Sequence, residues 1–416
     1  MMEKGIVVGI NINNEKGFAE SIEELKKLCF ACNIVTIGEI IQNTKHLNKA
    51  TYMGIGKLEE LKDLVLRLNP DVVVFNNELT GSQLRNIEEC IECRVVDRTT
   101  LILDIFAERA KTREAKLQVE VAKLQYQLPR IIGSNDDLGR QGNGVGRYNR
   151  GAGETKLELD KRKIQSKIND YNEELEILKS QRDTQRHRRK KSEIPTVALV
   201  GYTNSGKSTL LNCILDKFGE DEDKKVFEKD MLFATLDTSV RNIKLDDNKR
   251  FFLSDTVGFV SNLPHNLIKA FRSTLEEVCE ADLLLNIIDI SNEDYENMMD
   301  VTSETLRLIG ASNIPIINVF NKMDLIQQSI KDNFSQGVYI SAKTGEGIDN
   351  LIDDIRGIIF SDYVVCNMYI PYDKGNILSY LNDNTKIISK KYSETGTLLT
   401  VECSNIDFKK FNEYAQ

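Results

Sequence analysis

The stretch IPTVALVGYTNSGKST, residues 194–209, constrains the fold of this chain more than any other part of it. Its first half contains a short apolar run that predicts a buried strand, and GYTNSGKS after it is a full match to the pattern G-x-x-x-x-G-K-[ST]. Gly201 and Gly206 permit the tight path on which backbone N–H groups surround phosphates. Because this loop follows a predicted strand and precedes a predicted helix, it indicates a nucleotide-binding P-loop rather than a chance glycine-rich turn.

The chemistry of a P-loop gives specific roles to these side chains. Lys207 can reach the β- and γ-phosphates, and the Ser208 hydroxyl can bind Mg²⁺. The helix that starts near Thr209 would point its positive end at the same anion. The predicted phosphate-binding residues are Gly201, Tyr202, Thr203, Asn204, Ser205, Gly206, Lys207, Ser208 and Thr209.

Length, composition and charge narrow the class of protein. A chain of 416 residues is too long for a single core, so we expect two to four domains. No apolar run approaches the ~20 residues of a membrane span, and the start MMEKGIVVG does not have the pattern of a signal peptide. We therefore expect a cytoplasmic protein with reduced cysteines.

Positive charge is concentrated in one segment. Residues 109–191 hold 21 Lys and Arg against 12 Asp and Glu, an excess of nine positive charges, although the whole chain has a net charge of −9. A basic segment inside an acidic protein indicates an anionic partner.

Residues 1–108 alternate short apolar runs with amphipathic segments. This repetition predicts an N-terminal α/β domain in which helices cover a small parallel sheet. The tetrapeptide GIGK at residues 54–57 could be a second phosphate loop, but it lacks the Ser or Thr and a clear preceding strand, so we favour a glycine-rich helix start. Strands are expected at residues 5–12, 33–41, 71–77 and 93–97, and helices at 21–30, 57–68 and 81–91.

Two Cys-x-x-Cys pairs occur in the same domain, Cys29 with Cys32 and Cys90 with Cys93. Both pairs fall in or at the end of helical patterns, and the separation between them is far from that of a zinc ribbon. Cysteine acting as a small buried apolar side chain is the better interpretation, so we expect no zinc.

Residues 109–191 carry two heptad-patterned segments, and Pro129 is expected to end the first helix. Two such helices joined by a loop predict an antiparallel coiled-coil hairpin. The apolar positions are Leu117, Val121, Leu124 and Leu128 in the first helix, and Ile164, Ile168, Tyr171, Leu175 and Leu178 in the second.

The predicted tip of the hairpin, residues 130–153, has a composition suited to RNA. It contains seven glycines and Tyr148, together with Arg130, Arg140, Arg147 and Arg150. A plain linker has no need of these arginines, whereas a loop that becomes ordered on RNA can use them on phosphates and unpaired bases. The basic run at residues 186–191 could be a solvated face, but beside such a tip it favours RNA contact.

Residues 195–362 are predicted to form the P-loop domain, with further nucleotide motifs in order. LFATLDT contains Thr235 as the candidate switch threonine, and DTVG contains Asp255, which can hold a magnesium-bound water, and Gly258, whose N–H can sense the γ-phosphate. The turn at residues 246–248 predicts a β-hairpin between these motifs. Candidate nucleotide-binding residues are Phe233, Ala234, Thr235, Leu236 and Asp237 in the first motif and Asp255, Thr256, Val257 and Gly258 in the second.

Two later motifs identify the base. In NKMD, the Asp324 carboxylate can accept from the guanine N1–H and 2-amino group together, whereas adenine would leave it unsatisfied. The motifs in this order predict GTP binding. The candidate guanine-binding residues are Asn321, Lys322, Met323, Asp324, Ser341, Ala342 and Lys343, and residues 363–416 predict a small α+β domain without recognisable chemistry.

Several of these segments together resemble the HflX family of translational GTPases. They are GYTNSGKST, LFATLDT, DTVGF followed by LPHNLIKAFRSTLEE, and RGAGET ahead of Leu157-Glu158, and the resemblance extends upstream through GIGKLEELKDL and VVDRTTLILDIFAERAKTREAKLQVEVAKLQYQLPR. It implies a Ras-like P-loop GTPase domain, an N-terminal α/β domain with a helical hairpin, and binding to the large ribosomal subunit. Studied members of the family split stalled or idle ribosomes, and the resemblance implies that activity here as well. Some members confer antibiotic resistance, and some bind ATP through the N-terminal domain.

We therefore predict a monomeric, multidomain α/β protein that hydrolyses GTP with Mg²⁺ and uses its basic hairpin on ribosomal RNA. Lys207, Thr235 and Gly258 are the predicted catalytic residues, and Ser208 and Thr235 the metal ligands. Other interpretations stay open: a nucleotide-dependent remodeller of free ribosomal RNA, a ribosome-protection variant that confers antibiotic resistance, and a binding switch with negligible turnover.

Overall fold

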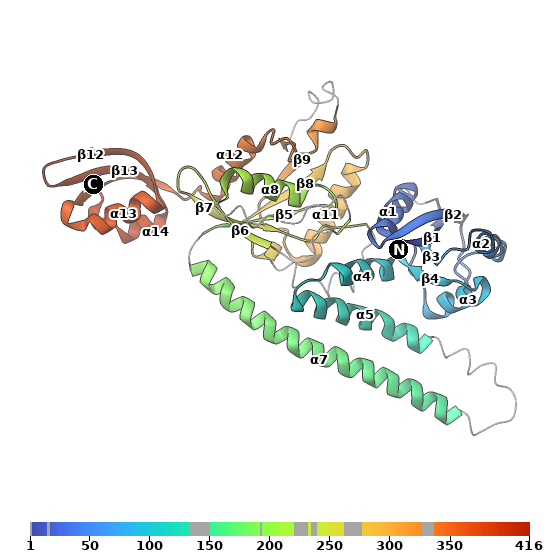
Figure 1. The fold of residues 1–416 in the computed structure, drawn as a ribbon. Coiled ribbons are helices and arrows are strands. Elements are labelled where there is room, and N and C mark those ends of the chain that lie inside the picture. Colours follow the sequence, from blue (N-terminus) through green and yellow to red (C-terminus); the bar gives the residue numbers. More distant parts are fainter. Residues whose placement is uncertain are drawn as a thin grey trace. The chain divides into compact units, whose positions relative to one another are not determined.

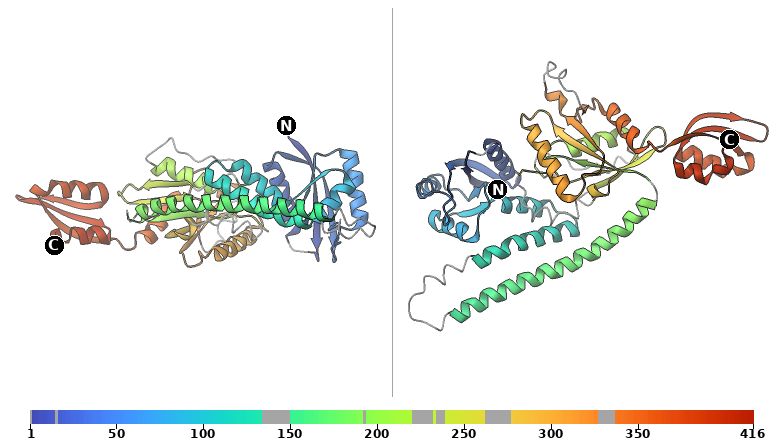
Figure 2. Two further views of the ribbon diagram at one scale, coloured as in Figure 1. Left: turned by 90° about the horizontal axis from the view of Figure 1, so that it is seen from below. Right: turned by 180° about the vertical axis from the view of Figure 1, so that it is seen from behind.

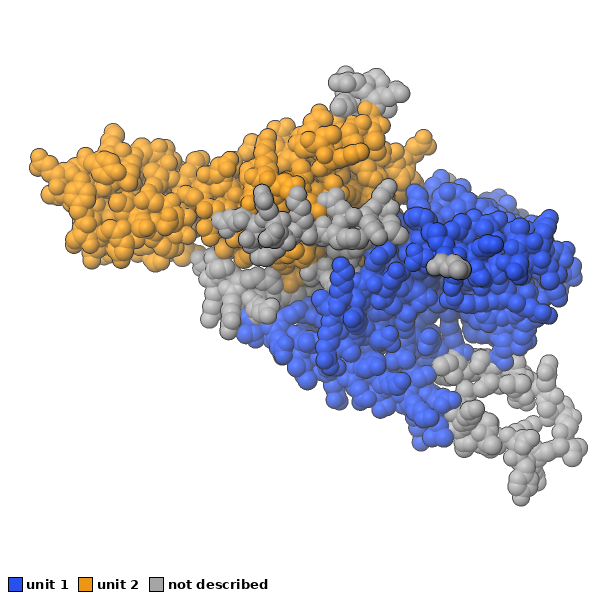
Figure 3. Space-filling view, in the orientation of Figure 1, with its two compact units in different colours: residues 1–186, 229–237, 261–273 blue, residues 187–228, 238–260, 274–416 orange. Residues whose placement is uncertain are grey.

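The structure is a computed structural model that describes residues 2–14, 17–133, 150–191, 194–219, 232–233, 239–261, 277–326 and 337–416. It divides into two units, which Figure 3 colours separately. The first comprises Met1–Arg186, Lys229–Asp237 and Ser261–Ser273, and the second comprises His187–Glu228, Thr238–Val260 and Thr274–Gln416. The P-loop and both predicted guanine-binding motifs therefore belong to the second unit.

The first unit begins with a four-stranded parallel sheet in the order β2-β1-β3-β4 (Figure 1). Helices α2 and α3 bury Leu61 and Ile87 against Ile6 and Val8 of β1, whose apolar residues suit a sheet covered by helices. The predicted parallel sheet is thus confirmed, and Gly54 of GIGK lies at the start of a helix. The elements are β1 (Glu3–Ile12), α1 (Phe18–Ala31), β2 (Ile34–Thr44), α2 (Ile55–Leu68), β3 (Val72–Phe75), α3 (Gly81–Ile91) and β4 (Arg94–Asp97).

Two helices, α4 (Arg98–Arg109) and α5 (Arg113–Gly133), follow the sheet. The prediction that Pro129 ends the first hairpin helix is wrong, because α5 continues through it to Gly133. Proline removes one helical hydrogen bond, but tertiary contacts hold the helix on both sides. The Tyr126 hydroxyl donates to the buried Asp97 carboxylate at 2.6 Å, and Arg130 forms an ion pair with the same group. Asp97 also caps α4 by accepting from the Thr100 N–H at 2.9 Å.

The long helix α7 (Arg150–Lys191) forms the second arm of the hairpin (Figures 1 and 2). Ion pairs join it to α5, one between Arg182 and Glu114 at 2.6 Å and one between Arg113 and Glu174. The predicted antiparallel hairpin is confirmed, whereas most of its tip, including Arg140 and Arg147, lies outside the described residues. No described helix is long and apolar enough to cross a membrane. The apolar positions predicted for α7 are all buried or half-buried: Ile164, Ile168, Tyr171, Leu175 and Leu178.

The second unit contains a six-stranded sheet in the order β10-β9-β8-β5-β7-β6, parallel except for the hairpin of β6 and β7. Helices α8 and α12 share a core with Val197 and Leu285 on one face, while α11 packs near Ile288 and Phe320 on the other. The elements are β5 (Thr196–Val200), α8 (Lys207–Phe218), β6 (Ser239–Lys244), β7 (Arg250–Asp255), β8 (Leu283–Asp289), α11 (Tyr295–Ile309), β9 (Ile316–Asn321), β10 (Val338–Tyr339) and α12 (Ile348–Ile359).

Residues 363–416, which we call the C-terminal lobe, form an antiparallel sheet in the order β11-β13-β12. Alternate residues of β13, such as Leu399 and Val401, are buried in a core that includes Leu381 of α13 and Phe411 beyond α14. The predicted α+β character of this segment is confirmed. Its elements are β11 (Val364–Pro371), α13 (Gly375–Asn384), β12 (Lys386–Tyr392), β13 (Gly396–Cys403) and α14 (Asn405–Lys410).

Candidate functional site

The parallel strands of the six-stranded sheet place the predicted site residues at one edge. The P-loop follows β5, Asp255 ends β7, Asn321 ends β9, and Ser341 comes shortly after β10. Because the carboxyl ends of parallel strands meet at the same edge of a sheet, these segments converge there. Hydrogen bonds among these segments join the P-loop to both predicted guanine-binding motifs.

Lys207 lies at the start of α8 and is buried. Its Nζ donates to the carbonyl oxygens of Gly201 at 3.0 Å and Tyr202 at 2.7 Å, so the side chain folds back along the P-loop. Burial lowers the pKa of Lys207 to about 8, and the negative charge of Asp255 opposes this shift. A phosphate beside Nζ would favour the charged form of the amine and so bind it strongly.

Ser208 and Asp255 meet where a metal ion would be needed. The Ser208 hydroxyl donates to Asp255 Oδ2 at 2.7 Å, and Asp255 is fully buried. Two hard oxygen donors at this separation form a set that suits Mg²⁺. Thr235, the other predicted metal ligand, lies outside the described residues, as do Ala234, Leu236 and Asp237.

The DTVG segment contacts the P-loop directly. A Cβ on Gly258 would lie 2.8 Å from Thr203 Cα and 2.9 Å from Lys207 Nζ, so only glycine fits at this position. Phe259, the next residue, is buried and is held to the P-loop by two main-chain bonds: the Thr203 N–H donates to its oxygen at 2.8 Å, and its own N–H donates to Gly201 O at 3.1 Å. The Thr256 hydroxyl donates to Leu199 O at 2.6 Å.

Asn321 connects three parts of the site. Its amide Nδ2 donates to Ser205 O at 2.9 Å, and its Oδ1 accepts from the Ala342 N–H at 2.9 Å. The side chain is 2% exposed, and a Cβ on Gly206 would lie 2.2 Å from Nδ2, so the P-loop must have glycine where it passes this amide. Asn321 therefore sets the spacing between the phosphate-binding loop and the two loops predicted to bind guanine.

The carboxylate predicted to recognise guanine is positioned by a neighbouring loop. Ser341 donates from its hydroxyl to Asp324 Oδ1 at 2.7 Å, while the Met323 N–H donates to Ile340 O at 3.2 Å. Asp324 and Lys343 are exposed to solvent. The second oxygen of Asp324 is thus available to a base.

Sequence reasoning missed Asp289, which ends β8. Its Oδ2 lies 2.6 Å from Nζ of Lys322, whose backbone is left-handed with φ of 68°. The ion pair fixes the direction of the Lys322 stem at the edge of the site. The sequence signal that could have identified Asp289 is an aspartate at the end of an apolar run that predicts a strand.

Phe233 belongs to the first unit, where its ring packs edge-on against Phe106 of α4 with 4.6 Å between ring centroids. It is 2% exposed. The sequence predicted Phe233 as a nucleotide-binding residue, and the structure places its side chain in an apolar contact.

The cysteines of the two Cys-x-x-Cys pairs have separate surroundings. Burial raises the pKa of Cys29 and of Cys32 to about 12, and the Cys32 thiol donates to Leu101 O at 3.5 Å. The Cys93 thiol donates to Pro70 O at 3.6 Å. Within the described ranges, no group of three His, Cys, Asp or Glu side chains could hold a metal ion. The absence of zinc stays a prediction.

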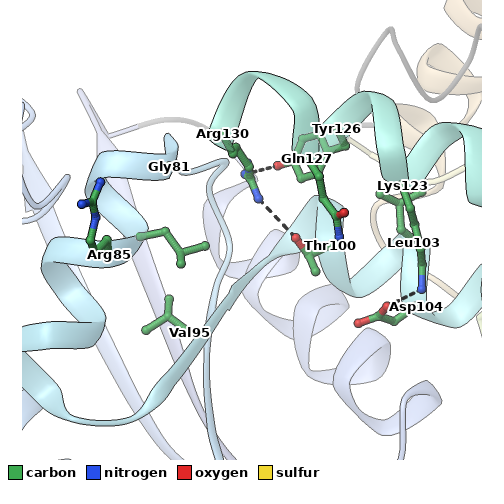
Figure 4. A pocket seen from close by; sticks show the side chains of 11 residues that line it. Gly81, Arg85, Val95, Thr100, Leu103, Asp104, Lys123, Tyr126, Gln127 and Arg130 are labelled. Carbon is green, nitrogen blue, oxygen red and sulfur yellow. Dashed lines mark hydrogen bonds and ion pairs between the residues drawn. The ribbon is translucent and has the colours of Figure 1, made fainter. Parts of the chain in front are cut away.

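The first unit contains a cavity of about 540 Å³ lined by residues of α3, β4, α4 and α5 (Figure 4). Two of its cations are paired, Lys123 with Asp104 at 2.8 Å and Arg130 with Asp97. The buried Nη2 of Arg85 has no hydrogen-bond partner among the described residues. The other lining residues are Gly81, Leu84, Val95, Thr100, Leu103, Tyr126 and Gln127.

The fold and the site of the second unit define a P-loop GTPase: a largely parallel sheet with the phosphate loop, DTVG, NKMD and SAK segments at one edge. Four family models match the chain along most of its length. They are described as GTP-binding GTPase N-terminal (residues 19–107), GTP-binding GTPase Middle Region (109–189), 50S ribosome-binding GTPase (196–322) and HflX C-terminal domain (325–412).

Curated relatives give the family. The chain is 44% identical to the GTPase HflX of Caldanaerobacter subterraneus subsp. tengcongensis over 400 residues, which are 96% of this chain and 91% of that protein. It is 35% identical to the GTPase HflX of Escherichia coli over 98% of this chain and 95% of that protein. The chain belongs to the HflX family of GTPases, and it is a GTP hydrolase.

One solved structure, a crystal structure of an SsGBP and GDP complex, is 26% identical and covers 86% of this chain and 99% of that chain, with a TM-score of 0.48.

Proposed function

We propose that this GTPase binds the ribosome, chiefly its large subunit, and that its nucleotide state sets the strength of that association. The observation that carries the proposal is the match of residues 196–322 to the 50S ribosome-binding GTPase model. The excess of nine positive charges in residues 109–191 supports it, because ribosomal RNA is polyanionic. We further propose that the protein is a cytoplasmic monomer that splits or rescues stalled or idle ribosomes.

The proposed division of labour follows the chain. Residues 1–108 form the N-terminal domain, 109–191 the basic hairpin with its tip at 130–153, 195–362 the GTPase domain and 363–416 the C-terminal domain. In this division the hairpin tip contacts RNA, while the GTPase domain controls when the contact is strong.

We propose the following roles at the nucleotide. Lys207 neutralises the β- and γ-phosphates, and its two carbonyl contacts keep its amine beside the loop. Gly258 reads the γ-phosphate through its N–H, as its close approach to Lys207 supports. Asn321, Lys322 and Asp324, with the loop of Ser341 and Ala342, hold guanine. The remaining P-loop residues and Thr235 complete the site.

Ser208 and Thr235 are the proposed ligands of Mg²⁺, with Asp255 orienting the metal's water shell. The bound ion supplies positive charge to the β- and γ-phosphates. The hydrogen bond between Ser208 and Asp255 supports this set, because it keeps both oxygens at the end of β7.

Phe259 gives a reason to expect slow hydrolysis by the isolated protein. It stands where Ras-like proteins have the glutamine that orients the attacking water, and a phenyl ring cannot hydrogen-bond to water. The two main-chain bonds from Phe259 to the P-loop support a residue that holds the segment rather than one that activates water. The missing catalytic assistance would then come from the ribosome.

The experiment is GTP turnover with purified large subunits, run beside free ribosomal RNA at matched salt. Replacing Arg140, Arg147 and Arg150 together with Ala should weaken ribosome binding and lower its salt slope by up to about three phosphate contacts. GTP affinity and the basal rate should not change, because these residues lie outside the nucleotide motifs. Full stimulation of the triple variant by large subunits would refute the role of the tip.

A matched control removes the same charge elsewhere. Lys27, Lys62 and Arg67 are exposed on α1 and α2, so their combined replacement by Ala removes three cations outside the hairpin. This variant should keep the wild-type salt slope. Equal loss of slope in both variants would mean that net charge, and not the tip, sets ribosome affinity.

A second candidate function is remodelling of free ribosomal RNA with ATP bound in the N-terminal domain. The cavity that this domain forms with α5 favours a small ligand, since about 540 Å³ is within the range of small-molecule sites. ATP binding that is abolished by filling the cavity with Leu84→Trp, together with turnover on free RNA, would support this candidate. No ATP binding, with stimulation by intact large subunits alone, would exclude it.

A further inference from the structure

The β-hairpin of β6 and β7 reaches from the nucleotide site to a different part of the second unit. At its open end, Ser239 pairs with Asp255, whose carboxylate accepts from Ser208. The six residues of each strand extend over roughly 20 Å to the turn at residues 245–249. Two main-chain hydrogen bonds close the turn: the Leu245 N–H donates to Lys249 O at 2.8 Å, and the Asn248 N–H donates to Leu245 O at 3.0 Å.

The turn binds the C-terminal lobe through two side chains. Lys249 Nζ lies 2.6 Å from Glu402 Oε1 on β13. The Asn248 amide donates to the main-chain oxygens of Asn382 at 3.0 Å and Thr385 at 3.3 Å, at the end of α13. One turn of the GTPase sheet thus contacts both a strand and a helix of the lobe.

Lys249 is buried and Glu402 is partly buried, which separates this ion pair from an ordinary surface pair. Lys249 is 5% exposed, and its Nζ lies 5.2 Å from the ring centroid of Phe360 and 5.0 Å from that of Tyr363. Although burial of Glu402 works in the opposite direction, its hydrogen bonds and charge interactions with Lys249 and Lys386 hold its pKa below the ordinary value. Removing Lys249 would leave a partly buried carboxylate with weaker compensation.

The hairpin also has a fixed conformation at the turn. Asn248 adopts a left-handed backbone with φ of 62°, which asparagine tolerates better than most residues. Asp247 lies 3.5 Å from Arg356 of α12 and 3.9 Å from Lys249, so the turn is attached to the GTPase core as well as to the lobe. The turn therefore contacts the lobe, α12 and its own hairpin at the same time.

We propose that Lys249 and Asn248 couple the C-terminal lobe to the nucleotide site through the β6–β7 hairpin. Along the chain, the hairpin connects Thr235, the proposed switch threonine, with Gly258, the proposed sensor of the γ-phosphate. A change from GDP to GTP at the open end therefore alters how the turn holds the lobe. By thermodynamic linkage, a partner that moves the lobe changes the relative affinity for GTP and GDP by the same factor. The inference rests on the proposed roles of Thr235 and Gly258 at the nucleotide, and it holds whether or not the ribosome is the partner.

The test uses the full chain with GDP and with the non-hydrolysable analogue GMPPNP. Calorimetry gives the ratio of the two dissociation constants for wild type, Lys249→Met and Asn248→Gly. The methionine keeps an apolar stem against the two rings, and glycine adopts the left-handed turn without strain, so at least one of these variants should fold as wild type does. We expect the ratio to change by about fivefold or more in a folded variant.

Lys386→Met is the matched control. Lys386 contacts the other oxygen of Glu402 at 3.4 Å, but it lies on β12 of the lobe itself and is 45% exposed. Its loss removes an ion pair to the same carboxylate without breaking the link to the hairpin, so the ratio should stay within about twofold of wild type.

Hydrogen exchange supplies a second readout. In wild type, the amides of residues 382–385 should exchange at different rates with GDP and with GMPPNP, and this difference should disappear in Lys249→Met. An unchanged ratio of dissociation constants in both turn variants would overturn the coupling. Identical exchange at residues 382–385 with the two nucleotides in wild type would also overturn it.

Discussion

Replacing Asp324 by Asn tests how this GTPase chooses its base. In the structure, Asp324 Oδ1 accepts from the Ser341 hydroxyl at 2.7 Å, and the side chain is exposed at the loop surface. The proposed guanine contact uses the carboxylate as acceptor for the N1–H and the 2-amino group. Asparagine has nearly the same shape, and the Ser341 hydroxyl can rotate to accept from its amide, so the loop itself should persist.

The magnitude follows from the hydrogen bonds that are lost. Each hydrogen bond to a charged acceptor contributes about 1.5–3 kcal/mol, and two are at stake. If the amide nitrogen of the substituted side chain faces guanine, both are lost and a donor meets a donor. We therefore expect GTP binding to weaken by about 3–6 kcal/mol, which is roughly a 10²- to 10⁴-fold increase in Kd.

Xanthosine triphosphate provides the discriminating ligand, because it carries a carbonyl in place of the 2-amino group. The Asp324→Asn variant should bind it more tightly than wild type does, with calorimetry measuring all four combinations of protein and nucleotide. Asp349→Asn is a suitable control, since it removes one exposed carboxylate from α12 of the same unit without touching the guanine loops. If Asp324→Asn keeps the wild-type preference for GTP over xanthosine triphosphate, the assignment of guanine recognition is wrong.

Three further predictions follow from the site and the first unit. Ser208→Ala should weaken binding of both GDP and GTP in Mg²⁺, whereas Thr235→Ala should spare GDP, because a switch segment closes only on the γ-phosphate; equal loss of GDP affinity in calorimetry would contradict the switch role. Although burial of Asp97 opposes ionisation, Arg130 and the hydrogen bonds to its carboxylate lower its pKa, so its stabilising contribution is present above about pH 4 and is lost as the pH falls through its lowered pKa. The difference in α5 hydrogen exchange between wild type and Asp97→Asn should therefore shrink as the solution is acidified, and a constant difference would count against it. Protein purified without added metal should contain no stoichiometric zinc; about one equivalent by elemental analysis, lost when Cys29 and Cys90 are both replaced, would overturn that prediction.

The nucleotide-binding part of the fold could be predicted because its determinants are local in sequence. Each loop of the site directly follows an apolar run that forms a strand. Because the strands are parallel and their crossover connections are right-handed, the loops meet at one edge of the sheet. Gly206 shows why the pattern is so restrictive: a side chain there would collide with Asn321, which lies far away in sequence but must pass the P-loop closely. A local motif therefore predicts a contact between distant segments only where the backbone geometry of that contact requires a particular residue, as at Gly206.

The contacts that sequence reasoning did not predict are polar pairs between distant segments. Pro129 was expected to end a helix, and by local propensity this was reasonable, but Tyr126 and Arg130 on either side of it bind Asp97, about thirty residues earlier in the chain. The contacts with the Asp97 carboxylate stabilise α5 and so offset the free-energy cost of a proline inside a helix, which local propensity alone does not take into account.

Lys249 and Glu402 make the same point at greater range, since nothing in the run DDNKR distinguishes a buried lysine from an ordinary turn residue. Burying an ammonium group is costly unless a partner is already in place, so its identity depends on a strand 153 residues away. Such a pair is weak evidence for stability, because an apolar pair of the same volume would often serve as well. An ion pair with hydrogen bonds does restrict the relative position of its two partners, because it is strong in one geometry only. We propose that this restriction, at a turn that connects a nucleotide site to a separate lobe, accounts for the charges at positions 249 and 402.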